Sequence, residues 1–204
     1  GQSGPEWAAS MVADLKARKN VTLLPRTTGF GYFQQNMVAL GERITEHMAV
    51  PDPDLPRERM WQVRADEVVI AQGGIERPLV FPGNDRPGVM LAGAAQTYLN
   101  KYGVAVGDKI GVFTACDTAY AAAFDLYEEG TDIEVIVDHR DSVDQALLDQ
   151  AKELGIRVMQ ASAVSKVDGH LRVSGIRVKP HAGGETERFD VDALIMSGGW
   201  TPSL

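Results

Sequence analysis

The stretch Glu67-Val-Val-Ile-Ala-Gln-Gly-Gly-Ile-Glu-Arg-Pro78 joins a short apolar run to a pair of glycines. Residues 68–71 predict a buried strand, and Gly73-Gly74 predicts that the backbone then turns sharply or passes close to another group. A similar pattern recurs in Asp192-Ala-Leu-Ile-Met-Ser-Gly-Gly-Trp-Thr-Pro202. Two such strands around an intervening α/β segment predict a domain inserted into another nucleotide-binding domain, with 68–71 beside or near 194–196 in one sheet.

Composition narrows the class of protein. With 204 residues, 44% of them hydrophobic and 24% charged, the chain can form a globular fold with a sizeable core. The net charge of −8 disfavours binding to nucleic acid or to an anionic membrane surface. The single Cys116 excludes an internal disulfide and favours a reducing, cytoplasmic setting. The sequence lacks an initiator Met, so we expect it to be part of a longer polypeptide.

The N-terminal part predicts one helix followed by a β-meander. Ser3-Gly-Pro-Glu6 has the pattern of a capping box, which begins a helix that ends near Asn20. A short strand is expected next, and then three longer strands that lead into the run 68–71. A turn at Gln35-Asn36 separates the first two of these longer strands. The predicted strands are 21–24, 27–34, 37–43 and 60–64.

After Pro78 the pattern changes to alternating strands and helices. Strand, helix, strand, helix and strand at this spacing predict a right-handed parallel βαβαβ unit. A hairpin with a type I′ turn at Asp168-Gly169 follows this unit, and another strand follows the turn at 182–184. The predicted helices are 92–102, 118–129 and 142–154, and the predicted strands are 109–113, 133–137, 164–167 and 171–178.

The expected fold class is therefore α/β, with a Rossmann-like, three-layer unit of the FAD/NAD-binding, disulfide-reductase type together with a β-meander. Residues 1–78 are expected to form part of an outer dinucleotide-binding domain. Residues 79–189 are expected to form an inserted Rossmann-like domain, and 190–204 a strand that returns to the outer domain.

The segment Lys109-Ile-Gly-Val-Phe-Thr-Ala-Cys-Asp-Thr-Ala-Tyr120 lies where a Rossmann fold carries Gly-x-Gly-x-x-Gly/Ala. Thr114 and Cys116 take the first two glycine positions, and only the small Ala119 is kept. Asp138 stands where a ribose-binding carboxylate belongs. The turn could still hold a nucleotide, or it could be a degenerate Rossmann turn kept for packing. The lost glycines favour the second interpretation, because their side chains would obstruct a pyrophosphate; Asp138 would then cap a turn or meet solvent.

Other candidate residues have both a functional and a structural interpretation. The glycine pairs at 73–74 and 198–199 could contact a ligand at strand ends or simply allow a tight crossover between domains. Arg77 could bind a phosphate or pair with Glu76 or Asp85. Trp200 could stack on a ligand, although packing is the more common role of such a residue. The four histidines lack metal spacing and no acid–base pair is recognisable, so no metal ligand and no catalytic residue is predicted.

At this point several long motifs resemble one family, the alpha subunit of heterotetrameric sarcosine oxidase. The resemblance covers nearly the whole chain, and its motifs are longer than the general flavoprotein pattern. The motifs are Arg26-Thr-Thr-Gly-Phe-Gly-Tyr32, Ala71-Gln-Gly-Gly-Ile-Glu-Arg-Pro-Leu-Val80, Asn84-Asp-Arg-Pro-Gly-Val-Met90, Thr97-Tyr-Leu-Asn-Lys-Tyr-Gly103 and Ser197-Gly-Gly-Trp-Thr-Pro202.

The resemblance implies a complex that oxidises and demethylates sarcosine to glycine while O2 is reduced to H2O2. It further implies that the beta subunit carries flavins, that the alpha subunit binds NAD, and that a folate domain lies downstream in alpha. The principal Gly-x-Gly-x-x-Gly loop of the family would lie upstream of this chain. Gln72 replaces the Thr that related flavoproteins have. The residues implied to make secondary NAD contacts are Thr27, Thr28, Ala71, Gly73, Gly74, Gly198 and Gly199.

Two other functions stay open from the sequence. One is a pyridine-nucleotide-dependent flavin reductase of the disulfide-reductase type, although the lost glycines and the absence of a second cysteine count against it. The other is a non-catalytic module that docks partner subunits. We expect the isolated chain to be catalytically silent, because it has neither the flavin loop nor a paired acid and base. The pattern cannot distinguish sarcosine from other secondary amines or opines.

Overall fold

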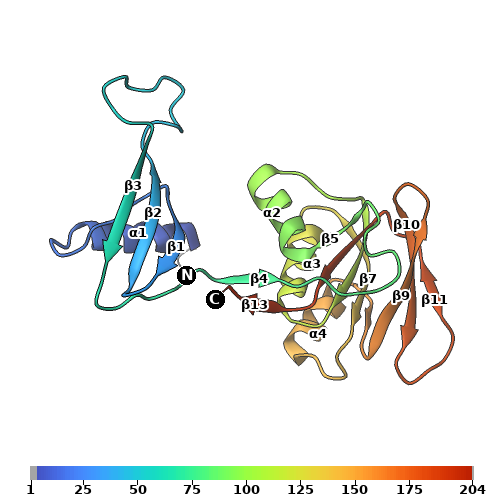
Figure 1. The fold of residues 1–204 in the computed structure, drawn as a ribbon. Helices are drawn as coiled ribbons and strands as arrows, with labels where there is room; N and C mark the ends of the chain where they lie inside the picture. The colour runs from blue at the N-terminus through green and yellow to red at the C-terminus, as the bar shows by residue number, and fades with distance from the viewer. Residues whose placement is uncertain (1–3, 204) are drawn as a thin grey trace. The chain divides into compact units, whose positions relative to one another are not determined.

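The computed structural model describes residues 4–203, and the chain divides into two compact units (Figure 1). The first unit is Gly1–Ala71 and the second is Gln72–Leu204. The sequence placed the boundary after Pro78, seven residues beyond the observed division at Ala71 (78 − 71 = 7). Each unit has its own secondary structure and is described by itself.

The first unit contains one helix and a three-stranded antiparallel meander, as the sequence predicted. Helix α1 is Gly4–Lys16, and β1 (Thr27–Phe33), β2 (Met37–Arg43) and β3 (Glu58–Arg64) pair in the order β1-β2-β3. Gln35 and Asn36 have φ of 59° and 52°, the left-handed conformation that a tight hairpin turn requires. The strand predicted at 21–24 does not form. Ser3 of the predicted capping box lies outside the described residues.

The buried strand predicted at 68–71 is wrong. These residues form no strand, and Val69 is 88% exposed. A short apolar run becomes a strand only when another strand pairs with it, and no strand pairing includes these residues. The glycine pairs instead flank a short antiparallel ribbon within the second unit, in which β4 (Gly74–Glu76) pairs with β13 (Trp200–Pro202).

A five-stranded parallel sheet forms the centre of the second unit. Its order is β5-β12-β6-β7-β8, so β12 pairs with β5 and β6 and not with 68–71. The segment 190–204 therefore supplies a strand within this sheet before it reaches the ribbon. The strands are β5 (Val89–Leu91), β12 (Ala193–Ser197), β6 (Lys109–Thr114), β7 (Asp132–Asp138) and β8 (Val158–Met159).

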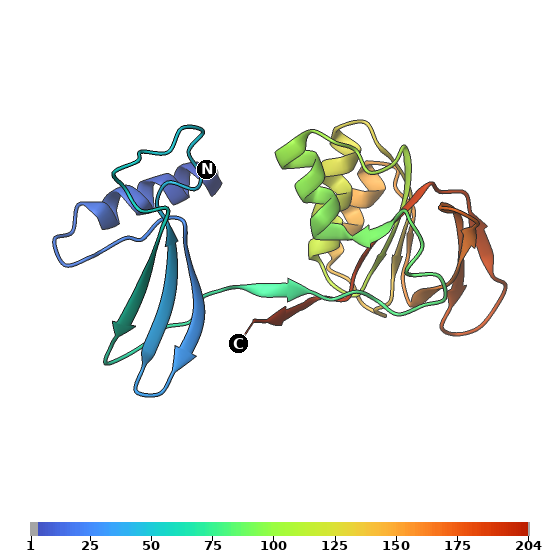
Figure 2. The ribbon, with the colours of Figure 1, turned by 45° about the horizontal axis from the view of Figure 1, so that its top comes forward.

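Helices cover one face of this sheet and a second, antiparallel sheet covers the other (Figure 2). The helices are α2 (Ala92–Tyr102), α3 (Thr118–Glu128) and α4 (Gln145–Glu153). The opposite layer has the order β11-β10-β9. Its strands are β9 (Ser162–Gly169), β10 (Val173–Pro180) and β11 (Glu187–Phe189). The predicted three-layer, Rossmann-like α/β unit is confirmed. The hairpin turn after Gly169 is longer than the predicted Asp-Gly turn.

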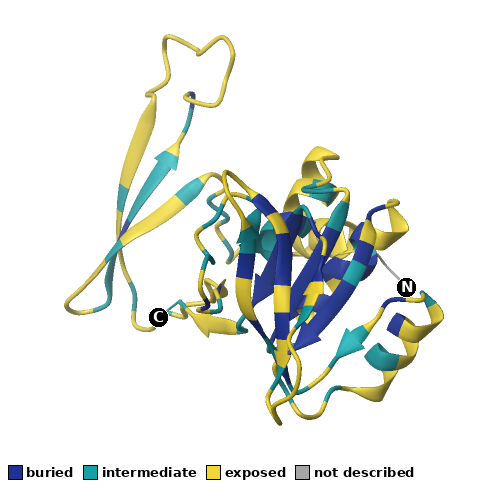
Figure 3. Ribbon diagram, turned by 90° about the vertical axis from the view of Figure 1, so that its right-hand side faces the viewer, coloured by how far each residue is buried: buried dark blue, intermediate teal, exposed yellow. Residues whose placement is uncertain are grey.

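Alternation along the strands divides the buried side chains between two cores. Ile110 and Val112 of β6 face the helices, whereas Phe113 of β6 and Val135 of β7 face the antiparallel sheet. The buried residues concentrate in the strands of the second unit (Figure 3). Because both faces of the sheet are covered, functional side chains on it are accessible chiefly at the ends of the strands.

Candidate functional site

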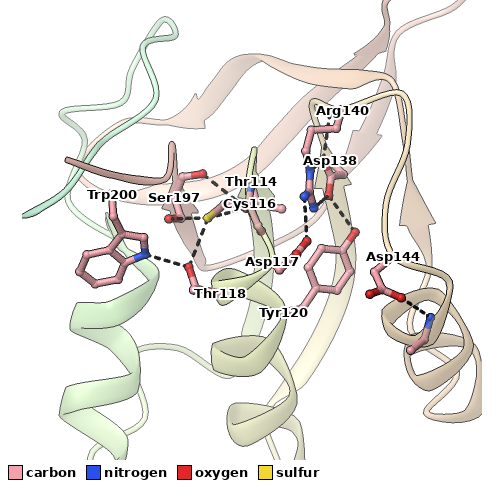
Figure 4. Close-up of polar contacts among 11 residues, drawn as sticks. Thr114, Cys116, Asp117, Thr118, Tyr120, Asp138, Arg140, Asp144, Ser197 and Trp200 are labelled. Atoms are coloured by element: carbon pink, nitrogen blue, oxygen red, sulfur yellow. Dashed lines mark hydrogen bonds and ion pairs between the residues drawn. The ribbon is translucent and has the colours of Figure 1, made fainter. Parts of the chain in front are cut away.

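Polar side chains gather at the carboxyl ends of β6, β7 and β12 (Figure 4). Parallel strands place their carboxyl ends at one edge of a sheet, where ligands bind in open α/β folds. Thr114 ends β6, Asp138 ends β7 and Ser197 ends β12. All three side chains belong to buried residues. This edge is therefore the candidate functional site of the second unit.

The turn from β6 into α3 is closed by its own side chains. Thr114 is fully buried, and its Oγ1 accepts a hydrogen bond from the Cys116 N–H at 3.0 Å. The same hydroxyl donates to the Cys116 carbonyl oxygen at 2.8 Å. In a glycine-rich phosphate turn, backbone N–H groups at this helix N-terminus face the ligand. Here the Cys116 N–H already has a partner within the turn.

The Cys116 thiol lies among three hydroxyl groups. Its Sγ is 3.2 Å from Thr118 Oγ1, 3.2 Å from Ser197 Oγ and 3.8 Å from Thr114 Oγ1. Burial raises the pKa of the thiol, but hydrogen bonds from these hydroxyls and from the Ala119 N–H together outweigh burial, so the pKa is lowered. The turn thus stabilises the thiolate of the chain's single cysteine relative to that of an ordinary exposed thiol.

Asp138 is fully buried and its two carboxylate oxygens are both occupied. Oδ2 accepts from Tyr120 Oη at 3.0 Å and from Arg140 Nη2 at 2.8 Å. Oδ1 accepts from the Arg140 backbone N–H at 2.9 Å and from Arg140 Nε at 3.0 Å. The prediction that Asp138 caps a turn is confirmed by the Arg140 N–H contact, whereas solvent exposure is wrong. Arg140 was not anticipated, although its position two residues after a strand-end aspartate was a usable signal.

Arg140 and Tyr120 respond strongly to this carboxylate. Arg140 also donates from Nη1 to Asp117 at 2.7 Å, and its carboxylate partners raise the pKa of the guanidinium further above its usual range. Burial, followed by the Asp138 charge, raises the pKa of the Tyr120 hydroxyl. Both side chains therefore act as fixed hydrogen-bond donors. Neither is placed to exchange a proton at neutral pH.

The ribbon of β4 and β13 is fastened to the helices by two side chains. Glu76, a buried residue of β4, accepts a hydrogen bond from the Gly93 N–H in the first turn of α2 at 2.9 Å. Leu91 at the N-cap of that helix provides no side-chain cap, so Glu76 supplies one. Trp200 Nε1 donates to Thr118 Oγ1 at 3.0 Å. Arg77 pairs with neither Glu76 nor Asp85 but donates to the Gly198 carbonyl at 3.1 Å.

The residues implied to contact NAD fall in both units. Thr27, Thr28 and Ala71 lie in the first unit, and the four glycines lie in the second. A Cβ at Gly74 would lie 3.1 Å from the Thr201 carbonyl oxygen, and one at Gly198 would lie 3.1 Å from the Arg77 carbonyl oxygen. Gly73 and Gly199 have φ of 74° and 90°. The backbone of the ribbon therefore explains why glycine occupies these four positions, and their contact with NAD stays a prediction.

Residues 4–203 contain neither a cluster of metal-ligating side chains nor a helix able to span a membrane. Within this range no group of three or more His, Cys, Asp or Glu side chains is placed to hold a metal ion. No helix in the same range has the length and apolar character needed to cross a membrane.

The fold resembles that of the FAD- and NAD-dependent disulfide oxidoreductases. Thioredoxin reductase from Lactococcus lactis matches 98% of this chain with 60% of its own, at 17% identity and a TM-score of 0.59. T. acidophilum thioredoxin reductase matches 72% of this chain with 49% of its own, at 18% identity and a TM-score of 0.59. The match to an FAD-dependent pyridine nucleotide-disulphide oxidoreductase from Desulfovibrio vulgaris covers 87% of this chain and 44% of that one, at 15% identity and a TM-score of 0.55.

Sequence comparison gives a narrower relationship. The chain is 41% identical over its full length to the sarcosine oxidase alpha subunit of Rhizobium meliloti, and 40% identical over 99% of its length to that of Corynebacterium sp. strain P-1. It is also 27% identical over 98% of its length to one subunit of the opine oxidase of Rhizobium meliloti. No protein-family model matches the sequence. The resemblance found in the motifs is confirmed: the chain is related from end to end to the alpha subunit of sarcosine oxidase, spanning about a fifth of that subunit's length.

Proposed function

We propose that this protein acts in the alpha subunit of a sarcosine-oxidase-type complex, which oxidises and demethylates sarcosine to glycine and reduces O2 to H2O2. The observation that carries the proposal is the 41% identity, across all 204 residues, to the alpha subunit of a sarcosine oxidase. The shared disulfide-oxidoreductase fold supports a role in dinucleotide binding, although the fold alone does not identify the ligand.

Within this proposal the chain contributes NAD binding and subunit structure, and the flavin chemistry takes place on a partner subunit. The NAD contacts proposed are Thr27, Thr28, Ala71, Gly73, Gly74, Gly198 and Gly199. The upstream glycine-rich loop would hold the pyrophosphate, and a downstream domain would bind folate. The partners are the other subunits of a heterotetramer, in the cytoplasm. NAD would be a structural ligand here, since the described residues near the strand ends form no acid–base pair that faces a substrate.

Purification of the affinity-tagged protein from its native host tests this proposal. We expect co-purifying flavin-containing subunits, peroxide release when sarcosine is added, and NAD in the extract of the denatured complex. The free 204-residue chain should release no peroxide. A complex that lacks flavin subunits, or that ignores every secondary amine tested, would disprove the proposed function.

The relative named opine oxidase supports a second candidate substrate class. Opines and sarcosine are both secondary amines, so one flavin centre could oxidise either. Parallel assays of the purified complex with sarcosine and with a set of opines separate the two. Peroxide release with opines but not with sarcosine would select the second candidate.

A further inference from the structure

We propose that the turn between β6 and α3 is a dinucleotide site closed by the chain's own side chains, so that any NAD bound by this protein lies elsewhere. The fold class places a dinucleotide at such a strand–turn–helix. Two groups of the ligand, the pyrophosphate and the ribose, each have a defined binding position in this fold. The pyrophosphate requires free backbone N–H groups at the helix N-terminus, and the ribose requires a free carboxylate at the end of the next strand.

The position that a pyrophosphate would occupy is blocked by side chains of the turn. Thr114 Oγ1 takes the Cys116 N–H at 3.0 Å, and this threonine is fully buried, so it is held in place by its surroundings. The Cys116 side chain occupies the second glycine position, where only a bare backbone allows a phosphate to approach. Asp117 adds a carboxylate at the N-cap of α3. A negative side chain there repels a pyrophosphate.

The carboxylate that would bind the ribose is also unavailable, for a separate reason. Both carboxylate oxygens of Asp138, which would accept hydrogen bonds from the ribose hydroxyls, already accept them from Tyr120 and Arg140. The carboxylate is fully buried, so a ribose could reach it only after both donors moved away. All four hydrogen bonds are accepted by a charged carboxylate, and hydrogen bonds to charged groups are the stronger ones.

Arg140 closes the space between these two positions. Its guanidinium bridges Asp138 of β7 and Asp117 of α3, as Figure 4 shows. An arginine at this point of the fold could otherwise accommodate the 2′-phosphate of NADP. Because two carboxylates already pair with the Arg140 guanidinium, it is not free to bind that phosphate. The same side chains therefore exclude both nicotinamide dinucleotides.

Titration of the 15N-labelled full chain with NAD, NADP and ADP tests the inference directly. The backbone amides of Cys116 and Arg140 report on the turn, whereas those of Thr28 and Gly73 report on the NAD contacts of the proposed function. We expect no saturable shift of Cys116 or Arg140 at ligand concentrations up to about 1 mM. Shifts confined to Thr28 and Gly73 would support both proposals. A saturable shift of the Cys116 amide that disappears in Asp138→Ala would overturn the closed site without touching the proposed function.

Opening the turn should restore weak binding. Thr114→Gly with Cys116→Gly frees the backbone. Addition of Arg140→Ala removes one hydrogen bond from each Asp138 oxygen and leaves those from Tyr120 and from the backbone N–H of residue 140. In this triple variant we expect NAD to bind at the turn at least about tenfold more tightly than in the wild type. Arg157→Ala is the matched control, because it removes an arginine from the exposed ion pair with Glu187 and keeps Thr114 and Asp138 paired; it should gain nothing. A folded triple variant without any gain would show that these side chains are not what closes the turn.

Discussion

At the scale of single residues, Arg140 illustrates how a buried charge depends on its partner. Its guanidinium satisfies a carboxylate with no exposure to solvent, while its own side chain is 28% exposed. Arg140→Met leaves Asp138 buried without its charge partner, and we expect a loss of about 3 kcal/mol in the free energy of unfolding. Tyr120→Phe removes one hydrogen bond to the same charge and should cost about 1.5 kcal/mol. Urea denaturation of each variant measures both values.

The Arg157–Glu187 pair provides the control for this prediction. Both of its side chains are largely exposed, at 52% and 43%, and its atoms are 2.5 Å apart. Arg157→Met should cost less than about 1 kcal/mol, because an exposed ion pair contributes little. Equal losses for Arg140→Met and Arg157→Met would contradict the idea that Asp138 is a buried charge in need of a partner.

Cys116 gives a prediction about pH. Its pKa is lowered because hydroxyls around it stabilise the thiolate, Ser197 most of all, against the opposing effect of burial. A thiol with a lowered pKa becomes reactive at lower pH, since the thiolate is the nucleophile. Ser197→Ala removes one of these hydroxyls and should shift the alkylation profile with iodoacetamide to higher pH. Ser174→Ala, on the exposed face of β10, should leave the profile where it is. An unshifted profile in Ser197→Ala would refute the role of this hydroxyl.

At the scale of elements, the ribbon and α2 depend on each other. The first turn of α2 lacks a capping side chain of its own and is capped by Glu76 from β4. We expect Glu76→Ala to lower the free energy of unfolding by about 1 to 2 kcal/mol, because a helix cap and a favourable charge at the helix N-terminus are lost together. Hydrogen exchange of the Gly93 amide should accelerate in this variant. Glu185→Ala, an exposed carboxylate in the loop before β11, should change neither quantity.

The elements that the sequence predicted well are those in which a local pattern and the tertiary context agree. Residues 92–102 and 118–129 gave α2 and α3 almost to the residue because a glycine with positive φ, Gly103 or Gly130, closely follows each helix. The failures share one cause. Residues 21–24 and 68–71 are apolar enough for strands, but strand formation depends on a partner strand that no local pattern encodes. For the same reason Leu194–Met196 joined β5 and β6 instead of 68–71.

The candidate site shows the same limit. The obstruction at Thr114 and Cys116 could be predicted because each glycine of the Rossmann turn has a stated geometric purpose. Tyr120 could not be predicted as a partner of Asp138, since it reaches the carboxylate only after α3 and β7 have folded together, whereas Arg140 lies two residues from Asp138 and had a local signal. Glu76 was also missed, because its role arises from a helix that begins 16 residues later (92 − 76 = 16). Sequence therefore indicated what the turn lacks, and the structure supplied what replaces it.

At the scale of the whole molecule, the two units differ in how much they bury. Of the described residues of the first unit, only Ala39 and Thr45 are buried. Aromatic and aliphatic side chains of its helix and sheet are instead exposed, among them Trp7, Phe30 and Met60. The second unit encloses two hydrophobic cores, one on each face of its parallel sheet. Burial of apolar surface is the main stabilising contribution to folding, so the two units should differ in autonomy.

We therefore predict that a polypeptide of residues 72–204 folds alone, whereas one of residues 1–71 does not. The first piece keeps both cores, the Asp138–Arg140 pair and the Glu76 cap, and should show a sigmoidal thermal transition by circular dichroism. The second piece has 71 residues and almost no buried side chains. Ordering its backbone costs roughly 1 to 2 kcal/mol per residue in conformational entropy, and so little buried surface cannot offset that cost. Its spectrum should change gradually with temperature. A cooperative transition in residues 1–71 would contradict this prediction and would mean that interactions other than the burial of apolar side chains stabilise the meander and α1.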